Sequence, residues 1–305
     1  MRESTQAGND SGIGRAKLLH YVALPFELGN LLRNRSTKTV ISQMVGNRSK
    51  SLQLSCLVVI CCLTMLLGGC ADFTAGPAPL DRTVDPALVQ THSRAGKVYC
   101  ARGYLGVFSI GMMQLADRID TKEGIVAVST ADLEYGRLQA WLIEQNKKGN
   151  LNEPLVLLGH SYGADDMIRV SQRLEKENMG VDLLILIDPV TPPPVPANVK
   201  RTYCVYFSRP ATDWVPAWRG VPATLEKNNK VTQLENLDLR GAKVDFPTDN
   251  IPHQYIDKNE GVQNLCIAEI KKVCPPRTVW LQTHPVSPVV TTQPSGNSGA
   301  SPRTQ

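Results

Sequence analysis

The pattern of hydrophobic and polar positions between residues 96 and 280 alternates between two periods. Six short runs rich in apolar or β-branched residues have the length of a strand, and they lie at 97–100, 125–129, 155–158, 181–187, 202–207 and 234–239. Between several of them, apolar side chains recur every three or four residues, as at Met112, Leu115, Ala116 and Ile119, which places them on one face of a helix. Further helices are expected at 131–148, 164–178 and 259–273. Strands that alternate with helices form a parallel sheet, so we expect a single α/β domain with a mostly parallel sheet and helices on both faces.

A longer apolar run, residues 52–69, lies outside this alternation and ends in Leu-Gly-Gly before Cys70. A basic start, an apolar core and small residues at the end are the marks of a secretory signal. The ending also resembles the bacterial lipobox, whose cysteine is lipidated. We therefore interpret 44–69 as a lipoprotein signal peptide and Cys70 as the lipidated first residue of the mature protein. The alternative is an uncleaved membrane anchor, because the run is about long enough to span a bilayer.

The segments around the signal peptide and the domain lack a regular period. Residues 1–43 are interpreted as a non-native upstream extension, because Met44 opens a signal peptide of ordinary length. Residues 70–95 contain several prolines and are expected to form an extended spacer before the domain at 96–280. Residues 281–305 are rich in Pro, Ser, Thr and Gly without periodicity, which predicts a disordered tail.

Charge separates the leader from the domain. The chain has 33 Lys and Arg against 28 Asp and Glu, a net charge of +5. Residues 1–69 hold eight basic and three acidic residues and so account for the whole excess, whereas 70–305 hold 25 of each. A neutral domain has no electrostatic basis for binding nucleic acid, so we do not expect a nucleic-acid partner.

Four cysteines follow Cys70, and they are Cys100, Cys204, Cys266 and Cys274. An exported protein could oxidise them. Cys266 and Cys274 are eight residues apart on an expected helix, so their Cα atoms are about 12 Å apart, beyond disulfide reach. Bridges from either residue to Cys100 or Cys204 stay open. No Cys-x-x-Cys or His-x-x-x-His spacing suggests a metal site, and we expect neither a metal nor an organic cofactor.

The motif that carries chemistry is Gly-His-Ser-Tyr-Gly at 159–163. It follows the buried run 155–158 directly and precedes an expected helix, which is the strand-turn-helix setting of a nucleophile elbow. The turn must be tight, so glycines flank the serine where a β-carbon would collide with the neighbouring strand or helix. We expect Ser161 to be a catalytic nucleophile and His160 to be a packing residue of the turn.

A serine nucleophile needs a general base and an acid that orients it, in the chain order Ser, Asp or Glu, His. His253 is the candidate base, because it lies in a loop between the last expected strand and the closing helix. Asp188 is the favoured acid, since a carboxylate that ends an apolar strand needs a partner. Asp213, in the loop after the next strand, is the alternative acid.

Two backbone N–H groups are expected to stabilise a tetrahedral oxyanion. The first is that of Tyr162, at the start of the helix after the serine, and the second is that of Tyr104 or Leu105, in the loop after the first strand. Trp214 and Trp218 lie in an irregular stretch, 208–230, and three roles stay open for them: to wall an acyl pocket, to form a lid, or only to pack beneath that stretch.

Four segments together resemble a group of small bacterial α/β-hydrolases described as lipase-like or thioesterase-like. They are Arg-Gly-Tyr-Leu-Gly-Val-Phe-Ser-Ile-Gly-Met at 102–112, Gly-His-Ser-Tyr-Gly-Ala-Asp at 159–165, Leu-Ile-Leu-Ile-Asp-Pro at 184–189 and His-x-x-Ile-Asp at 253–257. The resemblance covers about residues 96–275. It implies Ser161, Asp188 and His253 as a catalytic triad and chemistry on carboxylic esters or thioesters.

The expected protein is thus a hydrolase of the bacterial cell envelope, anchored to a membrane through Cys70 and facing the periplasm or the exterior. Its expected partners are a small acyl ester or thioester and the membrane. Two other functions share the same sequence features. One is a catalytically silent α/β-hydrolase fold that serves as an envelope binding protein, and the other is an acyltransferase that uses the same site.

Overall fold

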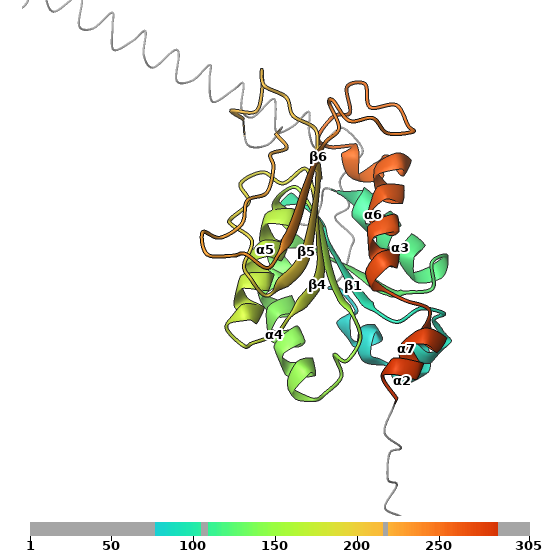
Figure 1. Cartoon of the computed structure of the whole chain (residues 1–305). Helices are drawn as coiled ribbons and strands as arrows, with labels where there is room; N and C mark the ends of the chain where they lie inside the picture. The colour runs from blue at the N-terminus through green and yellow to red at the C-terminus, as the bar shows by residue number, and fades with distance from the viewer. Residues whose placement is uncertain (1–76, 105–108, 216–218, 286–305) are drawn as a thin grey trace, which may run out of the picture. The chain divides into compact units, whose positions relative to one another are not determined.

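The computed structural model describes residues 77–104, 109–215 and 219–285. Its centre is a sheet of six parallel strands in the order β2-β1-β3-β4-β5-β6 (Figure 1). The strands are β1 (Lys97–Ala101), β2 (Val126–Thr130), β3 (Leu155–His160), β4 (Val181–Ile187), β5 (Val199–Tyr206) and β6 (Gln233–Asp238). Every residue of β1 and β3 is buried, as expected of strands with helices on both faces.

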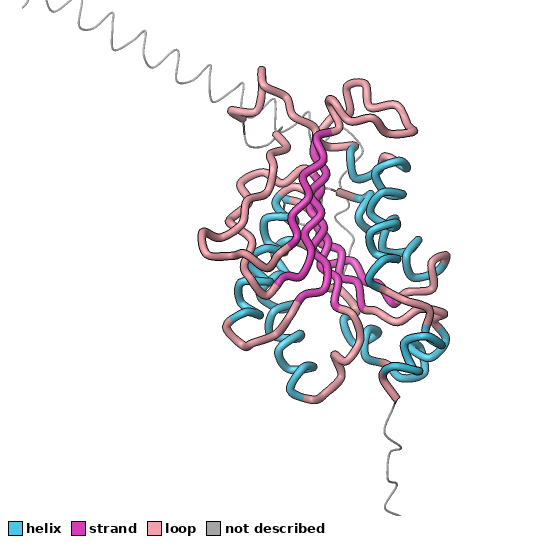
Figure 2. The backbone as a smooth tube through the Cα atoms, viewed as in Figure 1, coloured by secondary structure: helices cyan, strands magenta, loops and turns pink. Residues whose placement is uncertain are grey.

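Helices cover both faces of the sheet. α3 (Ile110–Thr121) and α6 (Glu260–Val273) lie on one face, and α4 (Tyr135–Lys147) and α5 (Tyr162–Glu175) lie on the other (Figure 1). Figure 2 shows the strands as a layer between these helices. Two apolar clusters fill the spaces, one beneath α3 and α6 and one beneath α4 and α5. The expected α/β domain with a parallel sheet and helices on both faces is therefore confirmed.

The order of the strands determines where a site can form. The chain runs from β1 outward to β2, returns to β3 on the other side of β1, and then continues through β4, β5 and β6. The carboxyl ends of β1 and β3 therefore form a topological switch point, where the two following loops separate to opposite faces of the sheet. Those loops are the segment that begins at Arg102 and the turn that contains Ser161.

The prediction that residues 70–95 form an extended spacer was wrong for residues 80–91. A 3-10 helix η2 (Leu80–Val84) and a helix α2 (Pro86–Thr91) occupy this stretch. The carboxylate of Asp85 accepts a hydrogen bond from Ala87 N–H, and Pro86 takes the first helical position, where its missing donor costs nothing. Leu80 is buried in the apolar cluster beneath α4 and α5, so this segment packs against the domain.

At the other end, the predicted disordered tail begins too early. A helix α7 (Arg277–Thr283) extends three residues into the range 281–305, and a short 3-10 helix η6 (Ile256–Lys258) precedes α6. The interpreted signal peptide, its upstream extension, Cys70 and the tail beyond residue 285 lie outside the described residues. Within the described ranges, no helix has the length and apolar character required to cross a membrane.

The four cysteines of the domain are buried, and all of them are free thiols. The disulfides that the sequence left open between Cys100 or Cys204 and the two cysteines of the closing helix region are thus not formed. In place of covalent links, the thiols contribute to packing as small apolar groups.

Candidate active site

Ser161 occupies a sharp turn between the end of β3 and the start of α5. Its backbone has φ 60° and ψ −128°, a conformation that is costly for a residue with a side chain. The two glycines of the motif make this turn possible. A β-carbon at Gly159 would lie 2.4 Å from the carbonyl oxygen of Gly163, and one at Gly163 would lie 2.4 Å from that of Arg102. The turn is thus the strained elbow that the motif predicts.

Three side chains from distant parts of the chain meet at this elbow. The Oγ of Ser161 lies 2.9 Å from Nε2 of His253, and Nδ1 of the same ring lies 2.9 Å from Oδ2 of Asp188. Ser161 and His253 are 7% and 6% exposed, and Asp188 is fully buried. The hydroxyl donates to one ring nitrogen while the other donates to the carboxylate, so the imidazole is oriented to accept the serine proton.

Asp188 follows β4 directly and has a positive φ of 47°. Its Oδ1 accepts from Phe207 N–H at 2.8 Å, and its Oδ2 accepts from Arg209 at 3.0 Å as well as from His253. Burial alone would raise the pKa of this carboxyl, but the bond to His253, the Arg209 guanidinium and the Phe207 N–H outweigh it and hold the pKa below its ordinary value. Asp188 is therefore ionised at neutral pH. Gly220 lies so close that a β-carbon there would overlap Oδ1.

Asp213, the alternative acid, lies elsewhere. Its Oδ2 accepts from Arg209 N–H at 2.8 Å within a turn, and the structure places no hydrogen bond between it and His253. Trp214 is 79% exposed, so it does not pack beneath its loop. Trp218 lies outside the described residues.

Of the three residues expected to supply oxyanion donors, the structure describes Tyr162 and Tyr104. No group in the described ranges accepts a hydrogen bond from Tyr162 N–H, which begins α5 beside the nucleophile. Tyr104 follows the end of β1, and its ring centre lies 5.9 Å from that of Tyr162. The neighbouring Gly103 N–H is engaged, because it donates to Oγ of Ser109 at 3.0 Å. Leu105, the other candidate, lies outside the described residues.

Two further groups lie near the elbow: Arg209, which the sequence did not single out, and His160, which was expected only to pack in the turn. Arg209 donates to Asp188, and its other guanidinium nitrogen donates to the carbonyl oxygen of Ile251 at 2.6 Å. His160 is 2% exposed, and its ring centre lies 5.0 Å from that of His253. Burial, together with repulsion from His253, lowers the pKa of His160 to about 3. Arg209 has no spacing that marks it, and nothing in the motif shows which groups the ring of His160 contacts.

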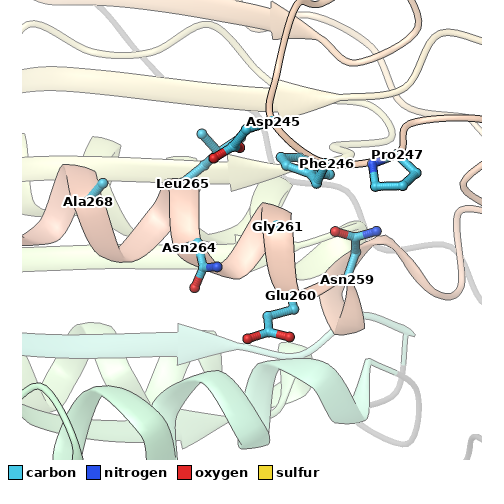
Figure 3. Close-up of a pocket in the computed structure, with 9 residues that line it drawn as sticks. All are labelled: Asp245, Phe246, Pro247, Asn259, Glu260, Gly261, Asn264, Leu265 and Ala268. Atoms are coloured by element: carbon cyan, nitrogen blue, oxygen red, sulfur yellow. The ribbon is translucent and has the colours of Figure 1, made fainter.

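A surface hollow of about 550 Å³ lies between the loop around Phe246 and α6 (Figure 3). Its lining comprises Asp245, Phe246, Pro247, Asn259, Glu260, Gly261, Asn264, Leu265 and Ala268. None of the three residues at the elbow lines it, so we do not place an acyl pocket there. The described residues contain no group of three or more His, Cys, Asp or Glu that could hold a metal ion.

Comparison with known proteins gives a distant structural likeness. No family model matches the chain, and no curated protein matches it. The thioesterase domain of NocB from the nocardicin cluster is 13% identical, with a TM-score of 0.37 over 58% of this chain and 93% of that one. A hydrolase of the α/β superfamily from Xanthomonas campestris pv. campestris is 18% identical, with a TM-score of 0.30 over 57% and 99% of the two chains.

The type II thioesterase BorB from the borrelidin cluster is similar at 9% identity, with a TM-score of 0.33 over 58% of this chain and 93% of that chain. These values are low, and the assignment to the α/β class rests instead on the strand order and on the helices that cover both faces of the sheet.

Proposed function

We propose that the protein is a serine hydrolase that cleaves carboxylic esters or thioesters through an acyl-enzyme. The observation that supports it most directly is the pair of 2.9 Å hydrogen bonds that link Ser161 to His253 and His253 to Asp188. The strained elbow and the position at the switch point of the sheet support the same proposal.

In the proposed reaction, His253 takes the proton of Ser161 as Oγ attacks the acyl carbon. Asp188 stays ionised, holds the imidazole and stabilises the imidazolium that forms. The N–H of Tyr162, with a second donor from the loop after β1, stabilises the negative oxygen of the tetrahedral intermediate. The imidazolium then protonates the leaving alcohol or thiol, and a water molecule activated by His253 releases the acid.

An active-site label tests this proposal. The full-length protein, purified in detergent, is treated with a fluorophosphonate and its intact mass is measured. We expect one adduct per chain, lost in Ser161→Ala and kept in Ser171→Ala, a buried serine of α5 whose hydroxyl donates to Met167 O. A folded protein that stays unlabelled would contradict the proposal. A series of ester and thioester substrates of increasing acyl length then defines the preferred substrate.

We also propose that the hydrolase acts in the bacterial cell envelope, anchored through a lipidated Cys70. The support is the apolar run that ends at this cysteine and the absence of net charge in the sequence after it. Metabolic labelling with a radioactive fatty acid is expected to mark the native protein and to be lost in Cys70→Ser. A native protein whose N-terminal peptide begins at Met1 or Met44 would contradict it.

A further inference from the structure

We propose that His160 and Ser109 are positioning residues, which tie the oxyanion loop after β1 to the backbone of the base His253. The inference rests on the proposed hydrolase function, because it assigns a role within that site. His160 lies next to the nucleophile, and the hydrogen bonds of its ring are to Ser109 and to the main chain of His253.

Three hydrogen bonds form a continuous chain across the elbow. Gly103 N–H donates to Oγ of Ser109 at 3.0 Å, Oγ lies 2.6 Å from Nδ1 of His160, and Nε2 of His160 lies 3.0 Å from the carbonyl oxygen of His253. All four residues are buried, and Ser109 is 6% exposed. The chain therefore joins the loop after β1 to the loop that carries the base.

The groups at the two ends of this chain determine the direction of every bond in it. A carbonyl oxygen only accepts, so Nε2 of His160 carries a hydrogen and donates to His253 O. A neutral ring then has a free lone pair on Nδ1, which accepts from the hydroxyl of Ser109. That hydroxyl oxygen in turn accepts from Gly103 N–H. Each donor has one acceptor, and no group is left without its partner.

A neutral His160 is required for this arrangement. A protonated ring would place a second hydrogen on Nδ1, and the hydroxyl of Ser109 would have to find another acceptor in a buried site. Burial and the neighbouring His253 and Arg209 keep the ring neutral, since they lower the pKa of His160 to about 3. The chain thus persists at neutral pH.

The position of the chain explains what it would do. Ser109 holds Gly103 N–H, so this N–H is not free to bind the oxyanion, and the start of the loop is held beside the elbow. His160 holds the main chain of His253, and this contact fixes the position of the His253 ring relative to Ser161. Small displacements of either group lower the rate of acyl transfer without weakening substrate binding.

Two substitutions of His160 separate the two ends of the chain. In His160→Asn, the side-chain oxygen occupies the place of Nδ1, so the link to Ser109 stays and the donor to His253 is lost. In His160→Gln, the amide nitrogen occupies the place of Nε2, so the donor to His253 stays. Ser109→Ala breaks the loop end without changing the elbow, and it tests the chain even when a variant of His160 does not fold. Ser171→Ala is the control for the loss of a buried serine hydroxyl.

The measurement is the rate constant of fluorophosphonate labelling, normalised to the final number of labelled sites, together with kcat and KM for an aryl ester. We expect His160→Asn and Ser109→Ala to lower the rate constant and kcat about tenfold, the effect of one lost hydrogen bond in the transition state, with little change in KM. His160→Gln should stay within about threefold of the wild type, because it keeps the bond that fixes the base and leaves the hydroxyl of Ser109 to accept from Gly103 N–H.

A merely structural role would reduce the number of labelled sites or the Tm and leave the rate constant per site unchanged. Wild-type rate constants in both His160→Asn and Ser109→Ala would overturn the positioning role. A wild-type protein that is folded but does not label would instead overturn the hydrolase function, so the two failures are distinguishable.

Discussion

The guanidinium of Arg209 is predicted to set the lower pH limit of activity. It donates to the same oxygen of Asp188 that accepts from His253, through bonds of 3.0 and 2.9 Å. The imidazolium that forms during acyl transfer therefore lies beside a permanent positive charge. Replacing Arg209 with Met removes this charge and keeps an unbranched side chain of similar length.

The size of the effect follows from the distance between the two cations. Because both bonds end on one oxygen, the two nitrogens lie within about 6 Å of each other, and at an effective dielectric constant near 20 two like charges repel by about 3 kcal/mol at that distance. The side chain of Arg209 is 15% exposed, so solvent and salt reduce the repulsion. We expect the net effect on the pH dependence to be about one pH unit.

The assay is kcat/KM for an aryl ester between pH 5 and 9 at constant ionic strength, a pH range of about four units that spans the titration of a histidine. In Arg209→Met, the acid limb should move to higher pH, because the protonated form of His253 is no longer repelled. Arg209→Lys keeps a positive charge and should keep the limb near its wild-type position. An acid limb that stays in place in Arg209→Met, or that moves to lower pH, would refute the electrostatic role of Arg209.

Three further predictions follow from other contacts. Asp188→Asn should lower kcat by about 10⁴, as expected when the partner of the base is neutralised. Asp213→Asn should change kcat less than about threefold, because its carboxylate bonds to Arg209 N–H instead of the base. The reverse order of the two effects in a steady-state assay would show that Asp213 is the acid. Burial raises the pKa of Asp257 to about 6, above the value of an unfolded carboxyl, so the fold loses stability as the pH rises from about 4, where the unfolded carboxyl ionises, to about 6. Asp257→Asn should therefore add about 3 kcal/mol at pH 8 and almost nothing at pH 4, and equal Tm changes at both pH values would contradict this. Burial raises the pKa values of the four thiols of the domain, Cys100, Cys204, Cys266 and Cys274. They should therefore resist iodoacetamide at pH 8 until the protein is denatured, and rapid labelling of the native protein would contradict their burial.

The local features of the fold were accessible from the sequence. The run 181–187 matches β4 residue for residue, and the helix expected at 259–273 begins one residue later, with Asn259 as its N-cap. These elements carry their own signals, namely continuous apolar residues for a strand buried on both faces and a capping side chain before a periodic run. The proline-rich stretch before the domain misled the prediction, because Asp85 and Pro86 begin a short helix instead of ending regular structure.

The site was accessible only where a residue type and its place along the chain were both informative. Ser161, Asp188 and His253 each end or follow a recognisable element, so their convergence could be expected from the chain order. Arg209 could not be found in this way, and His160 was expected only to pack in the turn, since their contacts depend on loops that meet only after folding. Asp165 is a similar case, because its carboxylate accepts from Val190 N–H and Thr191 N–H and so holds the loop that follows Asp188.

The most direct test of the proposed acyl transfer is to trap the acyl-enzyme. The full-length protein is mixed with an excess of an aryl ester, quenched with acid within the first turnover, digested and examined by mass spectrometry. The account predicts the mass of the acyl group on the peptide that contains Ser161, and neither adduct nor turnover in Ser161→Ala. Turnover by the wild-type protein with no acyl group on Ser161, or undiminished turnover by Ser161→Ala, would contradict it.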